Sequence, residues 1–215
     1  MNHFVVGDIH GCFYTFKKLL DEHWDPEKEV LVQVGDLVDR GKHAPQTVQL
    51  ARQLAADFPG RAHFLKGNHE AMMLEHFAKP PNYNWLRQGG QETLDQYEAS
   101  GRDINSDIQW IDALPLFYDH TSLYVSHAGI AQNTHDPFDE ENPYGILWNR
   151  SKLKNLNKLQ IVGHTPLKAP KYDPESEAYY IDTGAAYDGK LTGIKIGADG
   201  IPTELFQVKT DSRDL

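Results

Sequence analysis

The sequence predicts an α/β fold that combines a parallel sheet with a second set of strands. Apolar strand patterns and amphipathic helix patterns alternate along the N-terminal third at intervals of about 30 residues, as in successive βαβ units. Each expected strand ends in a polar cluster that contains glycine, and short strand patterns return from Leu116 onwards. Because the chain has no internal repeat and no linker, we expect one domain over residues 1–208 and a frayed tail over residues 209–215.

The expected strands of the first part cover residues 4–6, 30–34 and 62–65. Two helices separate these strands. The first has apolar residues at helical spacing, and the second, over residues 43–58, carries an apolar stripe and a proline in its first turn. Sites in such sheets form at the carboxyl ends of the strands, so the polar residues that follow the strands are expected to lie together.

The remainder of the chain divides into a helical part and a part rich in strands. Residues 69–114 predict helix and loop, with Trp85 as a core side chain, and the acidic loop over residues 136–144 is expected to be solvated. Asp188-Gly189 and Asp199-Gly200 are typical of hairpin turns. The C-terminal half is therefore expected to form a second, largely antiparallel set of strands.

Composition excludes several classes of function. A hydrophobic content of 40% and a charged content of 24% are ordinary for a soluble globular protein, and no apolar stretch approaches the ~20 residues that span a bilayer. The net charge of −10 argues against nucleic acids and anionic membranes as partners. The N-terminus lacks the basic and apolar regions of a signal peptide, and Cys12, the single cysteine, fits a reducing cytoplasm.

The stretch Gly35-Asp36-Leu37-Val38-Asp39-Arg40-Gly41 follows the expected strand at residues 30–34. It places two carboxylates and one guanidinium within five residues. Carboxylates that are packed together repel one another unless a cation or a proton lies between them, and Arg40 alone cannot satisfy both. A metal ion is one counter-charge that fits this pattern, and a polar turn in which Asp39 caps the next helix is the alternative.

Five such clusters follow expected strands, and together they favour a metal centre. Their side chains offer carboxylate, amide and imidazole ligands without a thiolate, a set that suits manganese, iron or zinc ions. Two ions need about six protein ligands when one carboxylate bridges them. The candidate ligands are Asp8, His10, Asp36, Asn68, His127 and His164.

These clusters also resemble the signature blocks of a known family. The segments Gly7-Asp8-Ile9-His10-Gly11, Gly35 to Gly41, Gly67-Asn68-His69-Glu70, His127-Ala128-Gly129 and Gly163-His164-Thr165 resemble those of the phosphoprotein phosphatase family of calcineurin-like metallophosphoesterases. The short chain and the segments Leu147 to Arg150 and Tyr180 to Ala185 are most similar to small bacterial and bacteriophage lambda-type serine/threonine protein phosphatases.

The resemblance implies a fold, a cofactor and a role for each site residue. The fold would be a sandwich of two mixed β-sheets flanked by helices, and the cofactor two divalent ions, with manganese expected. Asp8 and His10 would hold the first ion and Asn68, His127 and His164 the second, with Asp36 bridging the two. His69 would be the general acid, oriented by Asp39. Arg40, Arg150 and Asn68 would bind the phosphate of a phosphoprotein or of a small phosphate ester.

Other interpretations remain open at the level of sequence. A cysteine phosphatase needs an arginine six residues after its cysteine, and position 18 is a lysine, so Cys12 is expected to be a buried side chain at a helix start. A diadenosine tetraphosphate hydrolase of the same fold is an alternative, since Glu70 and Asp39 favour the protein phosphatase branch without deciding it. A third is a catalytically inactive metal-binding scaffold. For His69 the alternative role is a metal ligand, and for Arg150 it is a salt bridge to the acidic loop.

Overall fold

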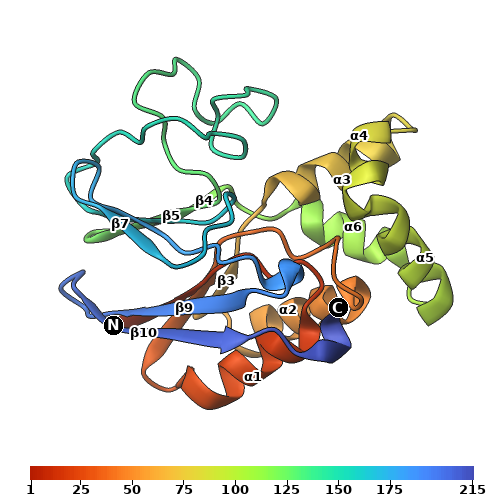
Figure 1. The fold of residues 1–215 in the computed structure, drawn as a ribbon, viewed down its shortest axis with the longest axis horizontal. Helices are drawn as coiled ribbons and strands as arrows, with labels where there is room; N and C mark the ends of the chain where they lie inside the picture. Colours follow the sequence, from red (N-terminus) through yellow and green to blue (C-terminus); the bar gives the residue numbers. More distant parts are fainter.

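The computed structural model describes residues 1–215 as two five-stranded mixed sheets that face each other (Figure 1). In the first sheet, helical crossovers connect three parallel strands, and an antiparallel pair from the end of the chain extends the sheet. Its strands, in spatial order, are β10 (Pro202–Lys209), β9 (Lys190–Ile196), β1 (Asn2–Val6), β2 (Glu29–Gln33) and β3 (Ala62–Phe64).

The second sheet is less antiparallel than the sequence analysis predicts. β5 pairs with β6, and β6 with β8, in parallel, so only the two edge strands are antiparallel to their neighbours. The strands, in spatial order, are β4 (Phe117–His120), β5 (Leu123–Ser126), β6 (Leu159–Val162), β8 (Ala178–Tyr180) and β7 (Lys171–Asp173). Apolar alternation marks a strand but does not specify its partner, which explains the error.

One of the two predicted hairpins is wrong. The strands on either side of Asp188-Gly189 belong to different sheets, because the chain passes from β8 to β9 through the short 3-10 helix η2 (Ala185–Tyr187). β9 pairs with β1 instead and lies between β1 and the edge strand β10 in the first sheet. Asp199-Gly200 does connect an antiparallel pair, β9 and β10.

Helices cover the first sheet and extend beyond one end of it. α1 (Phe13–His23) and α2 (Ala44–Asp57) pack on its outer face, and the helices after β3 gather beside them (Figure 1). None of the helices has the length and apolar character needed to cross a membrane. The later helical segments are α3 (Asn68–Ala78), α4 (Tyr83–Trp85), the π-helical turn η1 (Leu86–Gly90), α5 (Gln91–Ser100) and α6 (Ile104–Asp112).

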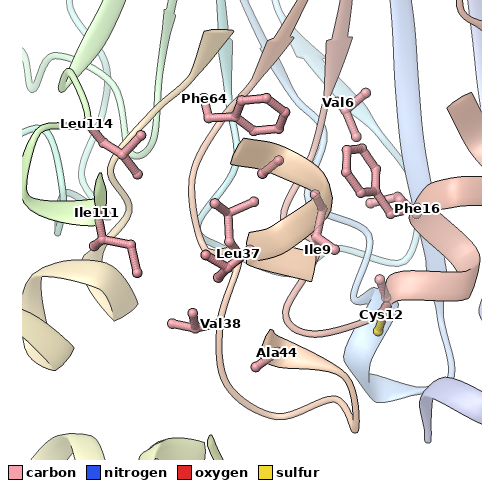
Figure 2. Close-up of a cluster of buried hydrophobic side chains, with 14 of the residues drawn as sticks. Val6, Ile9, Cys12, Phe16, Leu37, Val38, Ala44, Phe64, Ile111 and Leu114 are labelled. Carbon is pink, nitrogen blue, oxygen red and sulfur yellow. The ribbon is translucent and has the colours of Figure 1, made fainter. Parts of the chain in front are cut away.

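Successive residues of β1 serve two different cores. Phe4 and Val6 pack towards the helices, in the larger buried cluster that Figure 2 shows around Phe16 and Cys12, whereas Val5 packs towards the second sheet. A strand that is buried on both faces reads as a continuous apolar run. Cys12 is buried at the start of α1, as expected.

The outer face of the second sheet is covered by an irregular segment rather than by helices. Residues 127–158 contain no helix or named strand, and one isolated bridge joins Ala131 to Leu153. Tyr124 of β5 packs under this segment with Ile130 and Ile146. The segment includes the acidic loop at residues 136–144, most of which is exposed as expected.

The C-terminal tail packs on the domain instead of fraying. The carboxylate of Asp214, in the 3-10 helix η3 (Ser212–Asp214), is fully buried. It accepts hydrogen bonds from the backbone nitrogens of Tyr14 and Thr15 at 3.1 and 2.8 Å. Those two N–H groups lie in the first turn of α1, whose N-cap, Cys12, forms no capping bond of its own. The tail therefore supplies the cap that α1 lacks.

We expect Asp214→Ala to lower the free energy of unfolding by about 1–3 kcal/mol, because two helix N–H groups and the Thr15 hydroxyl lose a charged acceptor. Asp21→Ala is the matched control on the same helix, since its exposed pair with Lys17 contributes less than about 1 kcal/mol. Urea unfolding of both variants measures the difference. Equal stability of the two would contradict the capping role.

Candidate metal centre

The ends of five strands bring the predicted site residues to one buried location. Asp8 and His10 follow β1, and Asp36, Asp39 and Arg40 follow β2. Asn68 and His69 open α3 after β3, whereas His127 and His164 follow β5 and β6 of the second sheet. All of these side chains are buried except that of Arg40, which is half-buried. The structure thus brings all six candidate ligands together with the Asp39–His69 pair and Arg40.

Left-handed backbone conformations cluster at this location. Five of the eight non-glycine residues with positive φ are site residues, with φ between 48° and 70°. Such conformations cost free energy and persist where surrounding contacts determine them, as they do in functional sites. The five are His10, Asp36, Asp39, Arg40 and His164.

Asp36 lies at the junction of two groups of side chains that could each hold a metal ion. One group is Asp36 with His10 and His69, and the other is Asp36 with Asp8 and His127, with the ligand atoms of each group within 4.8 Å of one another. The family resemblance implies a different grouping, in which Asp8 and His10 hold one ion and His69 is not a ligand. The shared carboxylate is the one expected as the bridge.

Acceptor atoms face one another in the part of the site that contains Asn68. His127 Nδ1 lies 3.2 Å from the carbonyl oxygen of Val34, so that nitrogen carries the proton and Nε2 presents a lone pair. Nε2 is 2.8 Å from Asn68 Oδ1 and 3.1 Å from His164 Nδ1, which is itself 2.9 Å from Asn68 Oδ1. At most one proton is available among these three atoms. A divalent cation satisfies all three, so the donor set fits a metal ion.

Asp8 joins the two sheets at the site. Its Oδ2 accepts the backbone N–H of His164 at 2.9 Å, and its Oδ1 is buried without a hydrogen-bond partner. A Cβ on Gly163 would lie 1.9 Å from Asp8 Oδ1, so only glycine leaves room for this carboxylate. The free Oδ1 is a second observation that fits a cation.

The carboxylates perturb one another strongly. Burial and the neighbouring charges of Asp182 and Asp36 raise the pKa of Asp8 well above its usual value. Burial also raises the pKa of Asp36, but His127, His69 and His10 outweigh it, and the net pKa falls below its ordinary range. Because carboxylates packed together repel one another unless a cation or a proton lies between them, this compact group of acids is a good receptor for metal ions.

His69 and Asp39 form a buried pair beside these groups. His69 Nδ1 lies 2.5 Å from Asp39 Oδ2, and His69 Nε2 is buried without a partner. Burial lowers the pKa of His69, but the charges of Asp36 and Asp39 outweigh it, and the net pKa rises above the usual value. Burial raises the pKa of Asp39 in spite of its hydrogen bonds. With Nδ1 engaged by Asp39, only Nε2 faces the rest of the site.

The two arginines differ in position. Arg40 contacts His10 Nε2, and its guanidinium lies 5.3 Å from the ring centre of Tyr187. Arg150 is exposed and lines a cavity of about 420 Å³ that reaches Gly163 beside His164. Arg150 forms no ion pair with the acidic loop, where Glu140 pairs with Lys66 instead. Both guanidinium groups are therefore free of carboxylate partners.

Two acidic residues of the site have no role in the sequence analysis. The buried Asp182 follows β8 near Asp8, and its pKa is raised to about 6, mainly by burial. Glu70 is fully buried, and its carboxylate accepts the backbone N–H groups of Gly67, Asp36 and Leu37 at 2.8 Å each. Glu70 stands three residues after Gly67, the position from which a glutamate at a helix start bonds back to the N-cap N–H, and this spacing could have identified the residue.

Comparisons with known proteins agree with this geometry. The family model for calcineurin-like phosphoesterases matches residues 1–192. The chain is 33% identical to serine/threonine-protein phosphatase 1 of Salmonella typhimurium strain LT2, in an alignment that covers 89% of this chain and 90% of the relative. It is 28% identical to the asymmetrical bis(5'-nucleosyl)-tetraphosphatase PrpE of Bacillus cereus strain Q1, over 91% of this chain and 90% of that protein.

A solved structure gives the same fold. A putative diadenosine tetraphosphatase superposes with a TM-score of 0.68 at 21% sequence identity, over 98% of this chain and 94% of the other. The two facing sheets, the acid-rich centre at their strand ends and the match over most of the chain lead to one assignment. This protein belongs to the calcineurin-like phosphoesterase family.

Proposed function

We propose that this protein is a metal-dependent phosphomonoester hydrolase that acts on phosphoserine and phosphothreonine side chains of proteins. The observation that carries the proposal is the pair of ligand groups sharing Asp36 next to the buried His69–Asp39 pair. The serine/threonine phosphatase relative, at 33% identity over most of both chains, supports the choice of substrate. The six ligands are all present, which argues against an inactive scaffold.

The proposed ligands of the metal ions are Asp8, His10, Asp36, Asn68, His127 and His164. Two divalent ions bound there would supply Lewis-acid charge at the phosphate and lower the pKa of an attacking water. Manganese is the proposed metal, and iron and zinc also suit a set of oxygen and imidazole donors.

The remaining side chains bind the substrate and move a proton. Arg40 and Arg150, which have no carboxylate partners, bind the phosphate oxygens, since guanidinium groups match them in bidentate geometry. Asn68, which lies beside His127 and His164, contacts the same phosphate. The His69 imidazolium donates its Nε2 proton to the departing alkoxide, and Asp39, which accepts the Nδ1 proton, stabilises the protonated ring and fixes its orientation.

A dinucleoside polyphosphate is the second candidate substrate. The relative named as a bis(5'-nucleosyl)-tetraphosphatase aligns over 91% of this chain, almost the same share as the protein phosphatase. The two activities differ in the leaving group, which is an alkoxide in one and a nucleotide in the other.

A substrate panel tests the proposal. The metal-reconstituted protein is assayed with phosphoserine and phosphothreonine peptides, p-nitrophenyl phosphate and diadenosine tetraphosphate, and Asp36→Asn serves as the control for adventitious activity. We expect the highest kcat/KM on the phosphopeptides. A higher kcat/KM on diadenosine tetraphosphate would assign the second candidate instead, and no turnover of any of the four would refute hydrolase activity.

Metal content gives the next prediction. Manganese-loaded protein is expected to contain about two equivalents per chain, because one carboxylate can bridge two ions. Asp36→Asn is expected to lower the occupancy of both sites, whereas Asp107→Asn, a buried carboxylate far along the chain in α6, leaves it unchanged. Elemental analysis after gel filtration measures both. One tightly held ion and no second binding event would contradict the binuclear proposal.

The role of His69 gives a prediction about the leaving group. His69→Asn is expected to retain the metal ions and to lower kcat for an alkyl phosphate by roughly 10²–10⁴-fold, the range for a positioned general acid. The loss on p-nitrophenyl phosphate should be smaller, because p-nitrophenolate departs without a proton. Arg40→Ala and Arg150→Ala should raise KM on both substrates alike. An equal loss on both substrates for His69→Asn would reassign His69.

The nucleophile gives a further prediction. Direct attack by water predicts that Cys12→Ser remains active and that no phosphorylated protein accumulates during turnover. Cys12 is buried at the start of α1, and its pKa is raised to about 12 by burial, so it is a poor nucleophile. Rapid acid quenching followed by intact-mass analysis detects a covalent phosphoprotein, whose appearance would contradict direct attack.

A further inference from the structure

The carboxylate of Asp39 is held by two side chains that lie outside the strand-end clusters. Trp85 Nε1 donates a hydrogen bond to Asp39 Oδ2 at 2.8 Å, and Thr93 Oγ1 donates one to Oδ1 at 2.7 Å. Trp85 and Thr93 are both fully buried. The bond from His69 Nδ1 brings the number of donors on this one carboxylate to three.

The three donors favour the ionised form of Asp39 and fix its orientation. An indole N–H only donates, and it shares Oδ2 with His69 Nδ1, so Oδ2 acts as an acceptor for both. The Thr93 hydroxyl, donating to Oδ1 on the other side, prevents rotation of the carboxylate. His69 Nε2, which has no partner, is consequently held facing the site.

The two donors come from a single helical element that packs closely on the Asp39 backbone. Trp85 belongs to α4 and Thr93 to α5, and the turn η1 joins them (Figure 1). A Cβ on Gly89 in this turn would lie 2.6 Å from the backbone nitrogen of Arg40 and 2.9 Å from Asp39 Cβ. Only a glycine allows this approach. The element therefore supports the two adjacent residues, Asp39 and Arg40, that have a φ of 70°.

We propose that Trp85 and Thr93 are positioning residues for proton donation, which align Asp39 on His69 and thereby aim His69 Nε2 at the leaving-group oxygen. This inference rests on the proposed function of His69 as the general acid. It extends that function to a helical element whose sequence pattern indicates only packing. A misplacement of a reacting group by about 1 Å can cost roughly 10²-fold in rate. Two hydrogen bonds that position His69 through Asp39 can therefore change the rate although neither donor touches the substrate.

The test uses substitutions that remove one donor each and retain the shape of the side chain. Trp85→Phe removes the indole N–H, and Thr93→Val replaces the hydroxyl by a methyl group. We expect each to lower kcat on an alkyl phosphate by roughly 5- to 50-fold, less than the loss of the acid itself, with KM and metal content unchanged. On p-nitrophenyl phosphate the expected change is below about twofold, because that leaving group needs no proton.

Two matched controls separate this effect from a general loss of packing. Trp24→Phe changes a partly buried tryptophan that packs against the same core cluster and whose indole nitrogen has no partner. Thr47→Val changes a buried threonine whose hydroxyl bonds to its own helix at His43. Both controls are expected to retain kcat on both substrates. Thermal unfolding of all four variants establishes that each is folded under the assay conditions, and Thr93→Val carries the test if Trp85→Phe is not.

A double-mutant cycle isolates the positioning role. In the His69→Asn background there is no acid to align, so adding Trp85→Phe or Thr93→Val is expected to lower kcat no further. A further loss of the same size in that background, or an equal loss on both substrates in the parent, would overturn the inference. If His69→Asn itself shows no dependence on the leaving group, the proposed acid fails. If the kcat loss depends on the leaving group for His69→Asn but not for Trp85→Phe and Thr93→Val, only the positioning role fails.

Discussion

The site depends on one buried carboxylate, that of Glu70. By accepting N–H groups from Gly67 at the end of β3 and from Asp36 and Leu37 at the end of β2, it ties two neighbouring strand ends together. Asp36 can therefore maintain a left-handed backbone and still accept the N–H of His69 at 3.0 Å. Burial and the charge of Asp36 raise the pKa of Glu70 to about 7, and the amide hydrogen bonds offset only part of the cost of burying an acid next to other acids.

The second constraint is the packing of the two sheets. His127 and His164 come from the second sheet, whereas the carboxylates they face come from the first. The bond from the His164 backbone to Asp8 and the missing Cβ of Gly163 set how closely the two edges approach. Apolar side chains between the sheets, such as Val5 and Ile161, maintain that distance. The centre is thus assembled by tertiary packing rather than by any single motif.

Local patterns were sufficient to predict the strands, the first two helices and the strand-end clusters, because apolar periodicity and glycine placement act over a few residues. They were insufficient where the outcome depends on distant partners. The tail was expected to fray because nothing near Asp214 reveals that Tyr14 and Thr15 need an acceptor. Trp85 was expected to be a core side chain, which it is, but its hydrogen bond to Asp39 spans 46 residues and has no sequence signature.

Residues 130–158 of the irregular segment that covers the second sheet carry Arg150, proposed to bind the phosphate, and are separate in sequence from the proposed metal ligands. A single isolated bridge joins two residues within the segment 130–158, Ala131 and Leu153. The segment contacts the rest of the protein through apolar side chains and the ion pair of Glu140 with Lys66, and it carries Arg150 and lines the cavity beside the centre. None of the six proposed ligands lies within residues 130–158, since His127 precedes them. Changes in its length or sequence can therefore accumulate without disturbing the ligands, as surface connections generally tolerate insertions. Over evolutionary time such a covering allows one hydrolytic centre to be retained while the preferred leaving group diverges.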